Sequence, residues 1–230
     1  MSKDLVAPDE TLSVHTRAPY WKDVPDEKWL SWRWQMSNRL NTLDELGAVI
    51  NLTDSEREAL SAQGLFRVDI TPYFASLIDP DDPNCPIRKQ VVPHVAELHD
   101  PLGVIDPLEE EQHNPAPNVI KVYPDRIAWC VANNCASLCR HCLRKRMVGR
   151  ENFDFSRGAR QEALDYIAAT PDIRDVLLTG GVPLNFRKDT SAGSASGSSS
   201  AVASIQRASV IVAGVATLMP GMCAYQPSSE

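Results

Sequence analysis

The chain contains no run of about eighteen apolar residues, which is the length that a membrane-spanning helix requires. Residues 208–219 are apolar but form too short a run. Basic residues are also scarce, since 23 Lys and Arg against 30 Asp and Glu give a net charge of −7. This charge argues against a general nucleic-acid or anionic-membrane surface. The first residues lack the apolar core of a secretory signal peptide. We therefore expect a cytoplasmic protein with no membrane or nucleic-acid partner.

The cysteines, in contrast, form an informative pattern. Three of its six cysteines lie in one run, Cys135-Ala-Ser-Leu-Cys139-Arg-His-Cys142. The CxxxCxxC spacing supplies three thiolates and suits an iron-sulfur cluster. A four-iron cluster normally takes four thiolates, so three would leave one iron open to a small molecule.

Other interpretations of these cysteines are weaker. A structural zinc site needs a fourth Cys or His at suitable spacing. His141 lies between two of the cysteines, where it could not easily complete the same tetrahedron. A disulfide framework needs an oxidising compartment. Basic residues around the run favour the thiolate form that binds metals, which argues against an inert core. Cys85 stands alone and is interpreted as incidental.

The cysteine run and the residues after it, through Gly149, resemble the cluster loop of radical S-adenosylmethionine enzymes. The resemblance is to the lysine 2,3-aminomutase group, whose loop reads CxxxCRHCxRxR. It runs from about Trp21 to about Leu184 and then stops abruptly. Further segments resemble the family in the same order: Ile70-Thr-Pro-Tyr73, Ser76-Leu-Ile-Asp-Pro80, Asp82-Pro83, Arg88-Lys-Gln90, Tyr123-Pro-Asp-Arg126 and, downstream, residues 170–181.

The resemblance implies a radical enzyme of the amino acid 2,3-aminomutase type. Cys135, Cys139 and Cys142 would hold a [4Fe-4S] cluster whose open iron binds S-adenosylmethionine. Reductive cleavage would give a 5'-deoxyadenosyl radical that takes hydrogen from the substrate, while pyridoxal phosphate holds the migrating amino group. The implied partners are a small amino acid substrate, lysine or a related one, and a reductant that supplies one electron. The intact family also implies a possible homo-oligomer.

Further residue roles come from the same resemblance. Gly180 and Gly181 match the turn that contacts the methionine part of S-adenosylmethionine, and His141 would lie by its adenine side. The family usually carries an acidic residue after the glycines, where this chain has Val182. On their own, paired glycines after a strand are an ordinary turn.

Three other side chains match family positions near the substrate. Arg144 matches the arginine that pairs with the substrate carboxylate, a task that suits a planar guanidinium, although a surface cation is the plain alternative. Tyr123 and Arg126 match a segment close to pyridoxal phosphate. The lysine that anchors pyridoxal phosphate in the family has no matching position in this chain.

Local patterns predict the elements. A helix from Pro25 would place Trp29, Trp32, Met36 and Leu40 on one packing face. Capping boxes at Thr42 and Thr53 predict two more helix starts, the second helix ending near Gly64. Prolines divide residues 70–118 into short pieces, in which the run Glu109-Glu-Glu111 with His113 is interpreted as solvated charge. Strands are predicted at 119–123, 126–132 and 176–178, and a helix at 161–170.

The order strand, loop, helix, strand favours parallel pairing, with Cys135 and Gly180 at carboxyl ends of strands where ligands collect. We therefore predict an α/β protein: an N-terminal helical region followed by the first part of a partial (β/α) TIM-like barrel, incomplete in this chain. The Ser, Ala and Gly-rich tail would behave as a flexible linker. The predicted divisions are a loose leader (1–20), a helical and proline-rich wrapping region (21–117), the start of the radical enzyme barrel with the cluster loop (118–186) and a low-complexity tail (187–230).

Three functions remain open on the sequence. The first is the aminomutase-type enzyme, with activity impaired because the chain is truncated. The second is a non-catalytic iron-sulfur or zinc-binding fragment. The third is an interaction protein that uses the tryptophan-rich helical region.

Overall fold

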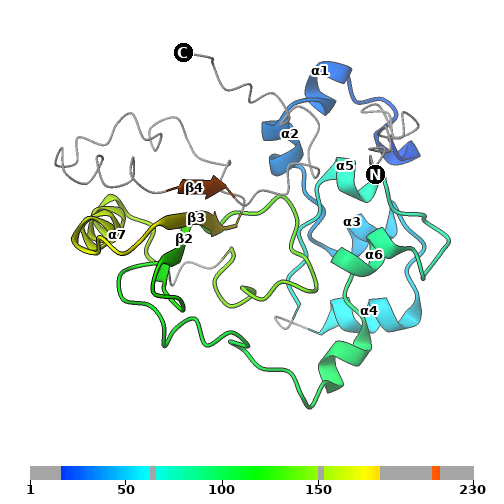
Figure 1. Cartoon of the computed structure of the whole chain (residues 1–230). Coiled ribbons are helices and arrows are strands. Elements are labelled where there is room, and N and C mark those ends of the chain that lie inside the picture. The colour runs from blue at the N-terminus through cyan, green and yellow to red at the C-terminus, as the bar shows by residue number, and fades with distance from the viewer. Residues whose placement is uncertain (1–16, 63–65, 150–152, 182–208, 213–230) are drawn as a thin grey trace, which may run out of the picture. The chain divides into compact units, whose positions relative to one another are not determined.

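The computed structural model describes residues 17–62, 66–149 and 153–181, together with the backbone of 209–212 (Figure 1). Two compact units divide the described chain, one ending at His99 and the other beginning at Asp100. The predicted divisions at residues 20, 117 and 186 stay predictions. Among the described residues, no helix combines the length and apolarity that a bilayer crossing requires.

The first unit is made of short helices. Proline occupies the first helical turn of three of them, where its missing N–H costs nothing. The predicted division of the proline-rich stretch into short pieces is confirmed within this unit. In chain order the helices are η1 (Pro19–Trp21), α1 (Asp26–Trp29), α2 (Trp32–Ser37), α3 (Leu43–Gly47), α4 (Asp54–Ser61), α5 (Pro72–Ala75), α6 (Pro86–Val91) and η2 (Val95–His99).

Both predicted capping boxes are confirmed. The Thr42 side chain accepts from the backbone N–H of Glu45, whose carboxylate accepts from the Thr42 N–H in return. Thr53 and Glu56 make the same reciprocal pair at the start of α4. The helix α4 ends at Ser61, and the predicted stop near Gly64 lies outside the described residues.

The predicted single helix after Pro25 is wrong. Ser31 interrupts it, because its hydroxyl accepts from the Trp34 N–H and so starts a second helix, α2. Leu40 is not helical and instead forms an antiparallel bridge with Ile70. Trp29 is fully buried, with its ring 6.0 Å from that of Trp34. The packing role of this tryptophan is therefore confirmed, although the predicted helical face is not continuous.

A buried ion pair joins α4 to α6. Arg88 donates to Glu56 from Nε at 2.8 Å and from Nη2 at 2.6 Å, and both side chains are almost fully enclosed. Arg88 also donates to the carbonyl oxygens of Asn51 and Pro80. The buried charges are thus paired and hydrogen-bonded, as burial requires.

The second unit is built on a sheet in the order β1-β2-β3-β4. The strands are β1 (Val119–Ile120), β2 (Arg126–Ala132), β3 (Asp175–Gly180) and β4 (Ser209–Val212). β1 pairs antiparallel with β2, whereas β2, β3 and β4 run parallel. The helix α7 (Arg157–Ala169) connects β2 to β3 and lies beside the sheet (Figure 1).

The core of this unit forms where α7 meets the sheet. Trp129 and Val131 lie on one face of β2, where they pack with Val176 of β3 and with Ala163 and Ile167 of α7. α7 begins at Arg157 because Ser156 caps it by accepting from the Ala159 N–H. The helix therefore starts four positions before the predicted residue 161.

The predicted strand, loop, helix, strand order and the parallel pairing are confirmed. β2 has the predicted bounds, β1 is shorter than predicted, and β3 is longer. β4 is a strand that the Ser, Ala and Gly-rich pattern of the tail does not predict. The fold is a mixture of helices and a small, mostly parallel sheet, which agrees with a partial α/β fold.

Candidate functional site

The cysteine run forms a loop that leaves the carboxyl end of β2. The N–H of Gly149 donates to the carbonyl of Asn133 at 2.6 Å and ties the two ends of this loop together. Inside the loop, the Cys142 N–H donates to the Cys139 carbonyl at 3.3 Å. Cys135, Cys139 and Cys142 are free thiols, each half-buried. The structure therefore holds the three predicted ligands on a single closed loop.

Apolar packing fixes the loop against the sheet. Leu138, Met147 and Val148 form a core with Ile120 of β1 and Cys130 of β2. Cys135 and Cys142 are packed against this core. Burial raises the pKa of Cys130 to about 11. Cys130 is accordingly a core residue of this unit.

The donor set suits a soft metal. Three thiols on one loop match the preference of iron-sulfur clusters for cysteine. Burial, followed by the neighbouring Cys142, raises the pKa of Cys139, so binding of a metal there would have to release protons. In the described part of the chain, no three His, Cys, Asp or Glu side chains are gathered closely enough to hold a metal ion. His141, between two of the cysteines, is exposed.

The glycine turn lies directly beside this loop. Gly180 is the last residue of β3 and pairs with Ala132, the last residue of β2. Its φ of 119° is on the side of the map that favours glycine, and a Cβ there would overlap the Ala132 carbonyl oxygen. A Cβ on Gly181 would come 2.6 Å from the carbonyl carbon of Asn134. Close backbone approach to the start of the cysteine loop thus explains both glycines physically.

Arg144 is enclosed by protein groups. Its Nε and Nη2 donate to Glu110 at 3.0 and 2.7 Å, and its Nη1 donates to Thr179 Oγ1 at 3.0 Å. Thr179 is the residue of β3 immediately before the glycine turn. Arg144 therefore connects the cysteine loop, β3 and the segment before β1, and its side chain is half-buried.

The prediction of a solvated acidic run at residues 109–111 is wrong for its middle member. Only 4% of Glu110 is exposed, and it accepts from both Arg144 and Arg146. Glu109 has a φ of 51°, a left-handed conformation that a non-glycine residue rarely adopts. Glu111 is exposed as predicted and contacts Arg146.

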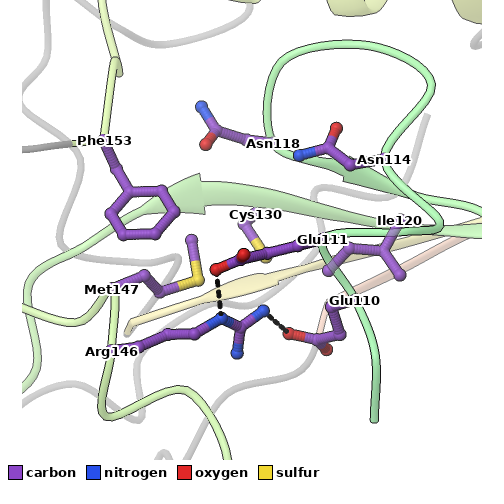
Figure 2. A pocket seen from close by; sticks show the side chains of 9 residues that line it. All are labelled: Glu110, Glu111, Asn114, Asn118, Ile120, Cys130, Arg146, Met147 and Phe153. Atoms are coloured by element: carbon purple, nitrogen blue, oxygen red, sulfur yellow. Dashed lines mark hydrogen bonds and ion pairs between the residues drawn. The ribbon is translucent and has the colours of Figure 1, made fainter. Parts of the chain in front are cut away.

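A small pocket opens next to this network (Figure 2). Arg146 reaches Glu110 and Glu111 on one side, and Cys130 and Met147 contribute the sulfur atoms. The pocket has room for about one water molecule. Its lining residues are Glu110, Glu111, Asn114, Asn118, Ile120, Cys130, Arg146, Met147 and Phe153. It is too small to receive a substrate and reflects the packing around the ion pairs.

Tyr123 and Arg126 lie at the opposite end of β2. Arg126 is the first residue of this strand and pairs in register with Asp175, the first residue of β3. The guanidinium lies 5.5 Å from the Tyr123 ring centre and pairs with Asp125. The structure thus brings the cysteines, glycines and Arg144 to one end of the strands and does not bring Tyr123 and Arg126 there.

Sequence reasoning missed two members of the site, Glu110 and Thr179. The one signal for Glu110 was charge, since an acidic run at 109–111 and a basic run at 144–146 are complementary. Thr179 stands directly before the glycines but carries no motif of its own. Neither contact could be derived from spacing, because each joins residues about 35 positions apart.

Comparison with known proteins identifies relatives over most of this chain. No family model matches. The L-lysine 2,3-aminomutase of Bacillus subtilis is 44% identical over 163 residues, covering 70% of this chain and 35% of that protein. The L-lysine 2,3-aminomutase of Clostridium subterminale is 41% identical over 179 residues, or 77% and 43%. The glutamate 2,3-aminomutase of Clostridioides difficile is 42% identical over 165 residues, or 71% and 39%. The chain therefore spans well under half the length of these relatives.

Proposed function

Since this chain is a sequence relative of the lysine 2,3-aminomutase family over 70% of its length, we propose that it is a radical S-adenosylmethionine protein of the amino acid 2,3-aminomutase type. The reaction would be a shift of an amino group between adjacent carbons of lysine or a related amino acid. The observation that carries the proposal is the position of the CxxxCxxC loop: three free thiols follow β2 directly, beside the glycine turn of β3. We propose that these strands are the first part of a TIM-like barrel.

Cys135, Cys139 and Cys142 would hold a [4Fe-4S] cluster through their sulfurs. The cluster and S-adenosylmethionine would supply a hydrogen-abstracting radical, and pyridoxal phosphate would stabilise the migrating amino group. The chain's own contribution would be to support the loop with the apolar core beneath it and to place the Gly180–Gly181 turn against the start of that loop. His141 would lie by the adenine part of S-adenosylmethionine.

Arg144 would receive the substrate carboxylate. A guanidinium offers five N–H donors in a planar fork, and only three are used by Glu110 and Thr179 among the described residues. Tyr123 and Arg126 are proposed near pyridoxal phosphate on the resemblance alone, since they lie at the far end of β2. A one-electron reductant and a cytoplasmic location complete the proposal, with a possible homo-oligomer as in the intact family.

Anaerobic reconstitution of the full chain with iron and sulfide tests this function. We expect iron and sulfide to bind, with the cluster absorbance lost in Cys135→Ala, Cys139→Ala and Cys142→Ala. Cys85→Ala is the matched control, because Cys85 is a buried free cysteine of the other unit. Equal iron content in all four variants would contradict the proposed ligands.

Cleavage of S-adenosylmethionine separates the remaining alternatives. A reduced, iron-loaded chain that releases 5'-deoxyadenosine supports the radical enzyme. Iron binding without cleavage would instead support the non-catalytic iron-sulfur fragment, and zinc in place of iron would support a zinc-binding fragment.

A further inference from the structure

Glu110 is an acidic residue that folding has enclosed next to the candidate site. Its two oxygens accept from Arg144 Nε at 3.0 Å, Arg144 Nη2 at 2.7 Å and Arg146 Nη2 at 2.9 Å. A buried carboxylate is stable only when it is paired in this way. The left-handed backbone of Glu109 immediately before it is the local distortion that accompanies this inward placement.

The contacts of Arg144 leave a defined part of its guanidinium available. Glu110 takes the edge formed by Nε and Nη2, and Thr179 takes one N–H of Nη1. One N–H on each terminal nitrogen then has no partner among the residues that the structure describes. The Arg144 side chain is 20% exposed, whereas Glu110 is 4% exposed. The exposed part of the pair is therefore the arginine.

We propose that Glu110 is a positioning residue for Arg144, which it holds by one edge so that the two terminal nitrogens face an incoming amino acid carboxylate. The proposal rests on the proposed function, in which Arg144 receives that carboxylate. It adds a residue that contacts neither substrate nor cofactor. Its effect is to fix the orientation of a flexible side chain before binding, which reduces the entropy lost on binding.

Competition between Glu110 and the substrate for Arg144 is the opposite possibility. The second partner of Glu110 argues against it, because Arg146 also donates to the same carboxylate and its side chain is 9% exposed. Losing Arg144 would leave the buried Glu110 carboxylate with Arg146 as its one remaining partner among the described residues, which is costly for a buried charge. An incoming carboxylate can instead use the terminal N–H groups without displacing anything.

The first test measures whether Glu110 holds the Arg144 side chain. In the full chain labelled with 15N-arginine, the side-chain Nε–H signal of Arg144 is assigned by its loss in Arg144→Lys. We expect exchange of this proton with water to become at least tenfold faster in Glu110→Gln. Glu111→Gln is the matched control, because Glu111 is 66% exposed and contacts Arg146 but not Arg144. An unchanged rate in Glu110→Gln, or an equal change in Glu111→Gln, overturns the proposal.

The second test measures how the loss of Glu110 changes the affinity for an amino acid. We expect L-lysine or L-glutamate, titrated calorimetrically into the full chain, to bind roughly tenfold more weakly to Glu110→Gln, about the loss of one charge-assisted hydrogen bond. Glu111→Gln should bind as the wild type does. Equal or tighter binding by Glu110→Gln overturns the positioning role. If the wild type and Arg144→Lys bind equally or not at all, the carboxylate role of Arg144 fails, while the exchange result still decides whether Glu110 holds it.

Discussion

Replacing Gly180 with alanine tests whether the glycine turn is required by packing, before any cofactor is considered. The φ of 119° lies outside the range that alanine favours, which costs about 1–3 kcal/mol. The new Cβ would also overlap the Ala132 carbonyl oxygen, which accepts from the Gly181 N–H at 2.6 Å. Moving that oxygen away would cost a further ~0.5–1.5 kcal/mol for the hydrogen bond. We therefore expect Gly180→Ala to destabilise the β2–β3 pair by about 1.5–4.5 kcal/mol.

Hydrogen–deuterium exchange, read on the peptides of β2 and β3, is the suitable assay. Tryptophan fluorescence would report mainly on the other unit, which contains four of the five tryptophans. A loss of about 1.5–4.5 kcal/mol corresponds to roughly 10- to 2,000-fold faster exchange. The matched control is Gly158→Ala in α7, where a Cβ would lie 3.6 Å from Ser156 Oγ and alanine should stabilise by about 0.4–1 kcal/mol.

Two outcomes of the exchange experiment would contradict this prediction. Exchange in Gly180→Ala that stays within about threefold of the wild type would refute the packing argument, because the estimated cost is larger than that. Faster exchange of similar size in Gly158→Ala would show that the loss does not come from the turn. The expected result holds with no S-adenosylmethionine present.

Other predictions concern the buried groups. Arg88→Met should lower the free energy of unfolding by about 3–5 kcal/mol, because it leaves the Glu56 carboxylate buried without its partner; a urea titration showing a loss under about 1 kcal/mol would contradict this. Burial alone would raise the pKa of Glu56, but hydrogen bonds from Arg88 and Thr53 outweigh it and hold this pKa below its ordinary value of 4.5. The stability from Glu56 is therefore present above about pH 4.5 and is lost as the pH falls through the lowered pKa. Glu56→Gln should flatten this loss of stability below about pH 4.5, and an unchanged pH profile would speak against the pair. The Cys130 thiol, with its pKa raised to about 11 by burial, should react with a thiol reagent at neutral pH only after unfolding, and rapid labelling of the native chain would be inconsistent with its place in the core.

Local signals in the sequence predicted the local structure well. Thr42 and Thr53 start helices as expected because a capping box is complete within four residues. β2 was delimited by its apolar and β-branched run between Arg126 and Ala132. The parallel pairing of β2 and β3 followed from the helix between them. Ser31, by contrast, caps a new helix at a point where the spacing of the tryptophans predicted one continuous helix.

Contacts between distant residues were not predictable from spacing. The burial of Glu110 depends on Arg144 and Arg146 arriving from a loop 34 to 36 positions later. The same acidic run without those partners would be solvated, as its charge suggested. For the cysteines, the sequence predicted the ligand identities and their place after a strand, and the structure adds the core that supports the loop.

The most direct test of the central claim is the electron paramagnetic resonance spectrum of the reconstituted, reduced chain recorded with and without S-adenosylmethionine. If Cys135, Cys139 and Cys142 hold a cluster with one iron open, the spectrum should be that of a reduced four-iron cluster and should change when S-adenosylmethionine binds that iron. A chain that retains no iron, or a cluster signal that S-adenosylmethionine leaves unaltered, would contradict the account.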